Sequence, residues 1–252
     1  MKVLLSPAKS LDFQTPVPCD QTSAPIFLEK AAQVNAVLRK KSPKKLMDLM
    51  GISPSLAALN YERNQAWSGE GNAAEERAAV YAFSGEVYRG LDVYNLLADR
   101  IELMQNTLRI LSGQYGLLRP LDQIMPYRLE MGTKLAIGRA KNLYEFWQKE
   151  VTKALASDLE PGEIVVNLAS NEYAKCVDFD TLENPVVTPV FQEFKNGQYK
   201  VLAVYAKHAR GLMARYIIES GAKSLENLMA FSDGGYVLSQ EMSQENQLIF
   251  TR

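Results

Sequence analysis

The stretch VVTPVFQEFKNGQYKVLAVYAKHARGLMARYIIESG, residues 186–221, contains both kinds of regular structure that this chain is expected to form. Residues 186–194 and 198–205 alternate between apolar and polar side chains, which is typical of strands with one buried face. The Asn196-Gly197 pair between them is the strongest short signal for a tight hairpin turn. The sequence therefore predicts two antiparallel strands that are joined at this pair.

A helix is expected directly after the hairpin, over residues 207–220. Gly221 follows it and can adopt the positive φ that commonly ends a helix. Lys207 and Arg210, three residues apart, share one face of this helix. The opposite face is expected to lie on the core, and it carries Leu212, Met213, Tyr216 and Ile217.

Strands and helices follow one another along the rest of the chain without the regular spacing of βαβ units. Strands are expected at residues 2–5, 79–83 and 163–168 and, as edge strands, near the C-terminus, and helices at 26–41, 99–108 and 139–159. Leu117 and Leu118 lie in a loop or a short strand between Gly116 and Pro120. No internal repeat and no long linker is present, so residues 1–252 are expected to form a single mixed domain of the α+β class rather than a doubly wound sheet.

The overall composition is that of an ordinary globular protein with little net charge. Of the 252 residues, 47% are hydrophobic and 23% are charged, and the formal net charge is -1. A site for nucleic acid must then be a local basic patch rather than the whole surface. Two stretches are lopsided: residues 39–45 hold five basic side chains, and residues 194–218 hold five basic side chains and no acidic one. We expect these two basic stretches to line one groove.

The cysteines and the N-terminus indicate the compartment. Cys19 and Cys176 are far apart and have no metal-ligand pattern nearby, so neither a disulfide framework nor a zinc site is expected. Only Val3, Leu4 and Leu5 precede a Ser-Pro pair at the N-terminus, which is too short for a signal peptide, and no apolar run approaches the length of a membrane span. We expect a cytoplasmic protein with reduced thiols and no membrane partner.

The first basic stretch leads into LMDLMGISPSLA, residues 46–57, which predicts two short helices that meet at a tight turn. Gly51 can take the positive φ that such a reversal needs, and Pro54 is favoured in the first turn of a new helix. The pattern resembles the helix-hairpin-helix of DNA-repair proteins, with Ser53 where a second glycine is usual. The backbone N–H groups of such a turn bind one phosphate whatever the base sequence. The expected DNA contacts are Lys40, Lys41, Lys44, Lys45, Gly51, Ile52, Ser53 and Ser55. The alternative is a basic, solvated helix followed by an ordinary turn.

The single histidine, His208, restricts the catalytic chemistry of the chain. A Ser-His-Asp or Cys-His arrangement would have to use it, and the neighbouring Lys207 and Arg210 disfavour the imidazolium that such a base forms. We expect His208 to be a surface or groove residue. The sequence contains no HExxH motif, no Walker loop and no GxGxxG after a strand, so zinc hydrolysis, P-loop chemistry and Rossmann cofactor binding have no support. No metal site and no cofactor is expected.

Polar residues beside glycines and at strand ends are candidates for a cleft. Tyr127, Arg128 and Glu130 lie within four residues and can either line a cleft or form a structural ion pair. Asn167 and Ser170 follow an expected buried strand, at a position where mixed sheets often carry functional groups. The complete set of expected cleft residues is Lys9, Arg119, Tyr127, Arg128, Glu130, Asn167, Ser170, Lys207, Arg210 and Arg215.

Six distinctive motifs lie in order along nearly the whole chain. They are SPAKSLD at residues 6–12, LSGQYGLLRPLD at 111–122, YRLEMG at 127–132, NLYEFW at 142–147, NLASNEY at 167–173 and YAKHARGLMAR at 205–215. Together they closely resemble the YaaA family of peroxide-stress proteins. This resemblance implies a cytosolic bacterial protein linked to peroxide defence, to limiting damage by unincorporated iron, and to DNA recombination and repair. It further implies DNA binding, an unusual mixed α/β fold, a positive cleft and a helix-hairpin-helix, which here falls near residues 42–67.

Two functional hypotheses follow, because no reaction is established for the family and the resemblance supplies no catalytic residues. The first is a DNA-binding protein, expected to be a monomer, that contacts the phosphates of double-stranded or structured DNA irrespective of base sequence. The second is an enzyme on a nucleotide, base or nucleic acid, since a cleft with Arg128, Glu130 and Lys207 has the polar variety that catalysis needs. A uniformly positive, open cleft favours the first, and a closed pocket with Glu130 or Glu172 at its base favours the second. Direct iron sequestration has little support, because the chain offers few ligands other than carboxylates.

Overall fold

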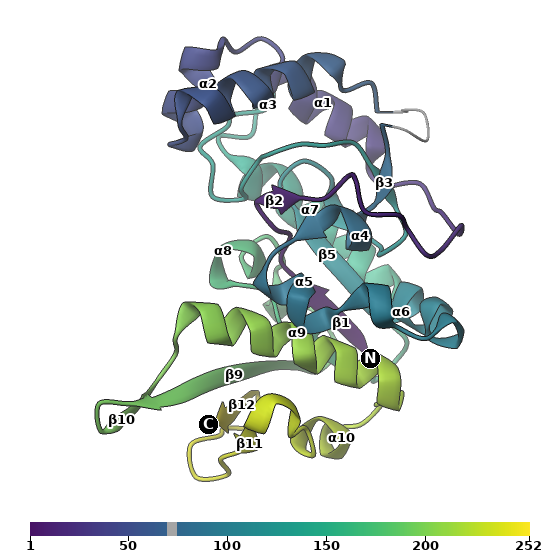
Figure 1. The fold of residues 1–252 in the computed structure, drawn as a ribbon, viewed down its shortest axis with the longest axis vertical. Coiled ribbons are helices and arrows are strands. Elements are labelled where there is room, and N and C mark those ends of the chain that lie inside the picture. Colours follow the sequence, from purple (N-terminus) through teal and green to yellow (C-terminus); the bar gives the residue numbers. More distant parts are fainter. Residues whose placement is uncertain (70–74) are drawn as a thin grey trace.

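The computed structural model describes residues 1–69 and 75–252, in which the largest sheet has eight strands (Figure 1). The order is β11-β12-β9-β8-β1-β5-β6, and β10 pairs with β9. Neighbouring strands run parallel through the middle of this order, from β12 (Gln247–Thr251) through β9 (Val186–Lys195), β8 (Val165–Asn167) and β1 (Lys2–Leu5) to β5 (Leu108–Ser112). The remaining strands pair antiparallel: β11 (Val237–Leu238), β10 (Gln198–Lys200) and β6 (Gly116–Leu118).

Two small sheets and a set of helices surround the large sheet. The small sheets pair β2 (Ser10–Leu11) with β4 (Phe83–Ser84) and β3 (Arg77–Ala78) with β7 (Gln123–Ile124). The α-helices are α1 (Leu28–Leu38), α2 (Pro43–Met50), α3 (Pro54–Ala66), α4 (Ala79–Ala82), α5 (Glu86–Leu91), α6 (Ile101–Thr107), α7 (Leu143–Ser157), α8 (Asn171–Ala174), α9 (Ala203–Ser220) and α10 (Leu225–Met229). Short 3-10 turns are η1 (Val93–Asn95), η2 (Ala98–Arg100), η3 (Phe179–Thr181) and η4 (Asp233–Gly235).

The middle of the sheet is buried on both faces. Every residue of β1, β5 and β8 is buried, as continuous apolar runs in parallel sheets usually are. The direction in which strands are added reverses at β1: the chain first adds β5 on one side and later β8, β9 and β12 on the other. Because β1 and β8 are parallel, with Leu4 opposite Asn167, their carboxyl ends lie side by side at this reversal. Such a point is the preferred ligand position in open parallel sheets.

The mixed α/β class predicted from the sequence is confirmed. The sequence also predicted that the sheet would not be doubly wound. Because the large sheet is mostly parallel and its strand order reverses at β1, that prediction is wrong for its centre. Residues 6–107 separate β1 from β5, its parallel neighbour, and much of that length forms short helices and small sheets. The regular spacing that identifies βαβ units is therefore invisible in the sequence, although the central strand order reverses as theirs does.

Three local predictions are also wrong. Residues 79–83 are mostly the helix α4, because a short run that is buried on every side has no periodicity that separates helix from strand. The second hairpin strand ends at Lys200 rather than at residue 205, and α9 begins at Ala203; the apparent alternation comes from Val204 and Tyr205, which are exposed. At the C-terminus, β11 is an edge strand but β12 lies inside the sheet. The Asn196-Gly197 turn is confirmed, with positive φ at both residues.

Two groups of helices lie at different parts of the molecule. The helices α1, α2 and α3 form one end of the long axis, above the small sheets in Figure 1. The long helix α9 lies in the other half, where it packs against α5 and β9. The basic residues 39–45 thus belong to the first group, and Lys207 and Arg210 belong to the second.

Candidate functional site

Two serines meet where β1 and β8 end. Ser6 directly follows β1, and Ser170 follows β8 after a two-residue link. The Ser170 backbone N–H donates to Ser6 Oγ at 2.9 Å, and Ser6 Oγ donates to Ser170 Oγ at 3.3 Å. Tyr88 of α5 donates its hydroxyl hydrogen to the Ser6 carbonyl at 3.1 Å. These bonds fix the loop after β1 against the loop after β8 and against α5.

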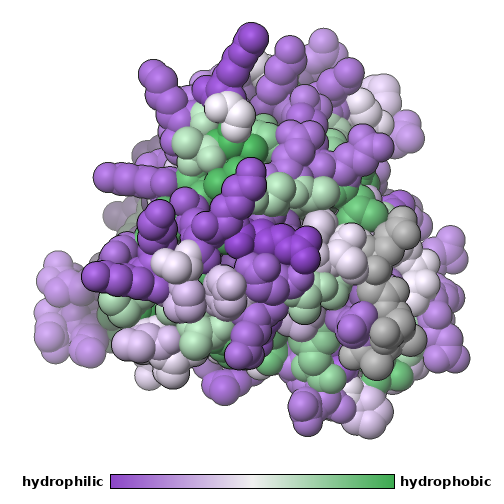
Figure 2. Space-filling view, turned by 90° about the horizontal axis from the view of Figure 1, so that it is seen from above, coloured by the Kyte–Doolittle hydropathy of each residue, from purple (hydrophilic) through white to green (hydrophobic). Residues whose placement is uncertain are grey.

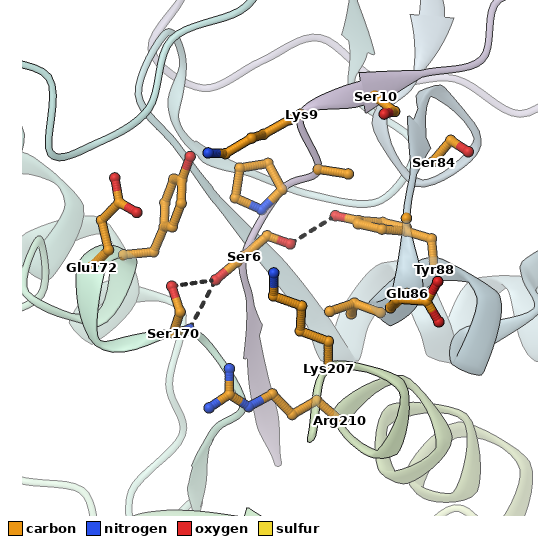
Figure 3. Close-up of a pocket in the computed structure, with 15 residues that line it drawn as sticks. Ser6, Lys9, Ser10, Ser84, Glu86, Tyr88, Ser170, Glu172, Lys207 and Arg210 are labelled. Atoms are coloured by element: carbon orange, nitrogen blue, oxygen red, sulfur yellow. Dashed lines mark hydrogen bonds between the residues drawn. The ribbon is translucent and has the colours of Figure 1, made fainter. Parts of the chain in front are cut away.

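A pocket of about 290 Å³ opens at this point (Figure 3). Four segments far apart in the sequence line it: the loop after β1, the start of α5, the loop and helix after β8, and the N-terminal half of α9. The lining residues are Ser6, Pro7, Ala8, Lys9, Ser10, Ser84, Gly85, Glu86, Val87, Tyr88, Ser170, Glu172, Tyr173, Lys207 and Arg210. The sequence predicted four of these as cleft residues: Lys9, Ser170, Lys207 and Arg210.

Lys207 and Arg210 supply positive charge that no neighbouring group neutralises. Within residues 1–69 and 75–252, neither side chain forms an ion pair or a hydrogen bond. Burial lowers the pKa of Arg210, and no carboxylate acts in the opposite direction. In Figure 3 the Lys207 ammonium and the Arg210 guanidinium extend toward Ser6 and Ser170. This part of the pocket is therefore suited to an anion.

The other charged groups around the pocket already have partners. Lys9 Nζ lies 2.6 Å from Glu130 Oε2, and Arg128 Nη2 lies 3.3 Å from Glu130 Oε1. Glu172 accepts a hydrogen bond from the Gly132 backbone N–H at 2.9 Å, and Glu86 pairs with Arg89 at 2.6 Å. Lys9, Arg128 and Glu130 thus form one cluster at the edge of the pocket, although Arg128 and Glu130, which the sequence predicted for the cleft, do not line it.

Two tyrosines form part of the pocket wall. Burial raises the pKa of the Tyr88 hydroxyl and that of the Tyr173 hydroxyl well above the usual range. Both phenols therefore stay protonated at neutral pH. They can donate hydrogen bonds or stack against a ligand, and neither is suited to act as a base.

The remaining predicted cleft residues do not line the pocket. Tyr127 is buried and shares a 2.6 Å hydrogen bond with Ser112, and Asn167 holds the backbone N–H of Ala169 at 3.2 Å. Arg119 pairs with the buried Asp122 at 2.9 Å. Arg215 binds the carbonyls of Leu91 and Asp92, the carboxylates of Asp92 and Glu219, and the carbonyl of Asn95. These four residues hold the fold together where they lie.

In the wall that the loop after β1 and the start of α5 provide, the sequence identified only Lys9 as a cleft residue. Ser6 belongs to a motif that the sequence made visible, and its position directly after a short apolar strand was the signal for a functional loop. The sequence contained no such signal for Ser84, Glu86 and Tyr88. With a strand expected over residues 79–83, the turn that starts α5 was not predicted.

The α2–α3 turn has the geometry predicted for two short helices at a reversal. Ser42 and Ser53 are the N-caps, each followed by proline, and their hydroxyls accept from Lys45 N and Leu56 N. Gly51 ends α2 with φ of 61°, and a Cβ on it would meet nothing within 4 Å. Ile52 and Ala57 are buried beneath the turn. Among the described residues, the backbone N–H groups of Ser53 and Ser55 have no hydrogen-bond acceptor.

The basic residues near this turn are accessible. Lys40, Lys44, Lys45, Ser53 and Ser55 are exposed, and Lys41 is half-buried. Figure 2, which views the molecule from the end formed by α1, α2 and α3, shows a face on which hydrophilic side chains predominate. These basic side chains are therefore open to solvent.

The two basic stretches do not line the same pocket. No residue of 39–45 contributes to the pocket that contains Lys207 and Arg210. A partial connection exists through α3, where burial and then the charge of Arg128 lower the pKa of Arg63. Arg63 therefore lies near the cluster of Arg128, Glu130 and Lys9 at the edge of the pocket.

Neither a metal cluster nor a membrane-spanning helix was found in the described chain. No group of three or more His, Cys, Asp or Glu side chains in residues 1–69 and 75–252 is placed to hold a metal ion. No helix formed by these residues is long and apolar enough to cross a membrane.

The fold and site define a mixed α/β protein. It has a pocket lined by unpaired cationic side chains at the point where the strand order of its parallel sheet reverses, and an exposed turn between two helices, preceded by basic residues, at one end. Residues 1–242 match the family described as peroxide stress protein YaaA, and the chain belongs to that family. Similar curated proteins, called UPF0246 proteins, occur in Flavobacterium johnsoniae, at 48% identity, and in Flavobacterium psychrophilum, at 46%; in both cases all of each chain is covered. One in Hahella chejuensis is 46% identical, over all of this chain and 99% of the relative.

Proposed function

We propose that the protein binds DNA through phosphate contacts at the α2–α3 turn, as part of the response to peroxide stress. The observation that carries this proposal is the exposed turn at Gly51 and Ser53 that starts α3, together with the exposed lysines of residues 40–45 that lead into α2. In this proposal, α2, the turn and α3 form a helix-hairpin-helix. The family description supports the link to peroxide.

The chemistry of the turn suits a phosphate. The unpaired N–H groups of Ser53 and Ser55 can donate to its oxygens, and the helix dipole favours negative charge at the same point. The open space above Gly51 lets a sugar-phosphate backbone approach closely. Ser53 replaces a second glycine, but its hydroxyl caps α3 and so preserves the start of that helix. None of these groups reads a base edge, so binding is expected to be independent of sequence.

The salt dependence of binding tests the phosphate contacts. If about five phosphates are neutralised, a plot of log K against log salt has a slope of roughly -4 to -5. Fluorescence anisotropy with duplex, bubble and junction DNA gives this slope and the preferred DNA form. A slope near zero, or strong preference for one duplex sequence, contradicts the proposal.

A matched pair of double variants tests the location. Lys44→Glu with Lys45→Glu reverses two exposed charges in the first turn of α2, and Lys149→Glu with Lys153→Glu reverses two exposed charges on α7. Both double variants change the net charge by the same amount, so a general electrostatic effect would weaken DNA binding equally in the two. We expect the first to weaken DNA binding much more than the second, with circular dichroism unchanged. Equal effects would place the DNA elsewhere.

Protection of DNA from iron-dependent oxidation is the expected consequence of such binding. Nicking of a supercoiled plasmid by ferrous iron and peroxide measures it directly. The parent protein should reduce nicking in proportion to the bound fraction of DNA, and the Lys44→Glu, Lys45→Glu variant should not. Protection by that variant would show that shielding through the turn is not the cause.

An enzyme on a nucleotide or nucleic acid is the second candidate, favoured by the mixed chemistry of the pocket. Glu172 lies in the same pocket as Lys207 and Arg210, at the position that parallel sheets use for ligands. Incubation with mononucleotides and short oligonucleotides, followed by chromatography, detects any turnover. Product formation that Glu172→Gln abolishes would establish this activity, and its complete absence leaves binding as the function.

A further inference from the structure

Arg210 differs sharply from Arg215, which follows it on the same helix. The Arg215 guanidinium makes hydrogen bonds and ion pairs with four residues. Arg210 is partly buried in the pocket, and no group of the described chain pairs with its guanidinium. Lys207, one turn earlier, is likewise without a partner. Lys207 is exposed, but removing the Arg210 cation from water in part, without a compensating anion, is unfavourable, so the fold maintains Arg210 there at a cost in stability.

The two cations converge on groups that can complete an anion site. The Ser170 hydroxyl accepts from Ser6, which leaves its own hydrogen available to a ligand. Lys207, Arg210 and Ser170 approach one another from α9 and from the loop after β8 in Figure 3. The carboxylates of Glu86 and Glu172 lie on opposite sides of the pocket in that view; Glu86 accepts from Arg89 of the same helix, and Glu172 accepts from the Gly132 backbone N–H. Lys207 and Arg210 therefore supply the positive charge of the lining that is not paired within the described chain.

The number of cations and the size of the pocket restrict the ligand. Two positive charges and a hydroxyl donor match a group with two negative charges and several acceptor oxygens, which is the chemistry of a phosphate monoester. A volume of about 290 Å³ is near the lower limit for small-molecule sites, so it accommodates one nucleotide unit and excludes a duplex. The apolar wall of Pro7, Ala8 and Val87 with Tyr88 can contact the rest of such a ligand.

We propose that this pocket binds a phosphate monoester of about the size of one nucleotide, through Lys207, Arg210 and the Ser170 hydroxyl. The ligand is either a free mononucleotide or the 5′-phosphate at the end of a single DNA strand. This site is independent of the α2–α3 turn, so it does not require that the turn binds DNA.

Isothermal titration calorimetry of the full-length protein tests the proposal with five probes. Inorganic phosphate and deoxyadenosine 5′-phosphate should bind, and deoxyadenosine without phosphate should not. A tetramer of deoxyadenylate, with and without a 5′-phosphate, distinguishes the two sources. Tighter binding of the phosphorylated tetramer than of the mononucleotide identifies a strand end, and the reverse identifies a free nucleotide. If no phosphorylated probe binds, or if deoxyadenosine binds as well as its phosphate, the proposal is wrong.

Charge-removing variants locate the site. Arg210→Gln and Lys207→Gln should each reduce affinity for the mononucleotide by at least about tenfold, since each removes a charge-assisted contact. Arg139→Gln and Lys223→Gln remove exposed charges elsewhere and should leave affinity unchanged. The Arg210→Gln protein should fold at least as stably as the parent, because it loses an unpaired charge. Full affinity in Arg210→Gln overturns the assignment, and so does loss of mononucleotide binding in the Lys44→Glu, Lys45→Glu variant.

Discussion

Gly90 of α5 and Gly211 of α9 lie directly against each other where the two helices cross. A Cβ built on Gly90 would clash with the His208 carbonyl oxygen and lie 3.1 Å from Gly211 Cα. A Cβ built on Gly211 would clash with the Val87 carbonyl oxygen. The backbones can approach this closely only because both residues lack a side chain. The crossing holds Lys207 and Arg210 opposite the start of α5, and so sets the width of the pocket.

Gly211→Ala should therefore destabilise the protein, although helix propensity alone predicts the reverse. Alanine in a helix interior is favoured over glycine by about 1 kcal/mol. The added methyl group here meets backbone atoms rather than a flexible side chain, so the helices must separate, at a cost of roughly 1–3 kcal/mol. Urea unfolding gives the net change in free energy. A more stable variant would mean that α5 and α9 are not in this contact.

This crossing also explains what the sequence could and could not predict. The helical pattern, the apolar face of α9 and its end at Gly221 follow from local spacing, which is why they were predictable. In the sequence, a glycine inside a helix indicates only a position of low helix propensity. Its partner, Gly90, lies about 120 residues earlier in a six-residue helix that has no clear signal. The contact therefore depends on tertiary structure that local patterns do not encode.

The pocket residues also divide into those that the sequence could predict and those that it could not. Ser170, Lys207 and Arg210 were predictable because they follow a buried strand or occupy one face of a regular helix. Arg119 and Arg215 were predicted for the same cleft on their charge alone, and they form ion pairs elsewhere. Charge identifies residues that need an anionic partner, but only the packed structure decides whether that partner is a neighbouring carboxylate or a ligand.

Gly51→Val should reduce both stability and DNA binding. Gly51 has φ of 61°, which a β-branched residue adopts only with strain, and the expected cost is on the order of 1 kcal/mol or more. The site has no steric contact that would add to it. Gly51→Asn should lose less stability, because asparagine tolerates this conformation. Urea unfolding and DNA anisotropy measure the two effects.

Gly138→Val is the matched control for that variant. Gly138 has φ of +58° and equally open surroundings, but it lies outside the α2–α3 turn. Its replacement should cost similar stability while leaving DNA affinity unchanged. If Gly138→Val weakens DNA binding as much as Gly51→Val, the effect comes from general destabilisation rather than from the turn.

Cys176 should not respond to peroxide in the folded protein. Its side chain is fully buried, and burial raises the pKa of the thiol to about 12. The reactive thiolate then amounts to about one molecule in 10⁵ at neutral pH. Mass spectrometry after brief treatment with iodoacetamide should find label on Cys19, which is partly accessible, and not on Cys176. Both should react in denaturant. Rapid labelling of Cys176 in the native state would reopen a thiol-based role in the peroxide response.

Asp12, which directly follows β2, should make stability depend on pH in the acid range. Its carboxylate accepts from the backbone N–H groups of Gln14 and Thr15 at 2.8 and 3.0 Å. Hydrogen bonds, first from the Thr15 side chain and then from these N–H groups, lower the pKa of Asp12 from 3.8 to about 2. A depressed pKa means that the ionised form stabilises the folded state. This contribution is complete above the unfolded pKa near 4 and is lost as the pH falls toward about 2.

Asp12→Asn keeps the shape of the side chain and removes its charge. The free energy of unfolding in urea should therefore differ from that of the parent by a constant amount between about pH 5 and 7 and by a shrinking amount below about pH 4. Asp20→Asn, at an exposed position, is the control for the loss of one negative charge. A difference between parent and Asp12→Asn that stays constant down to about pH 2.5 would mean that Asp12 does not hold this loop through its charge.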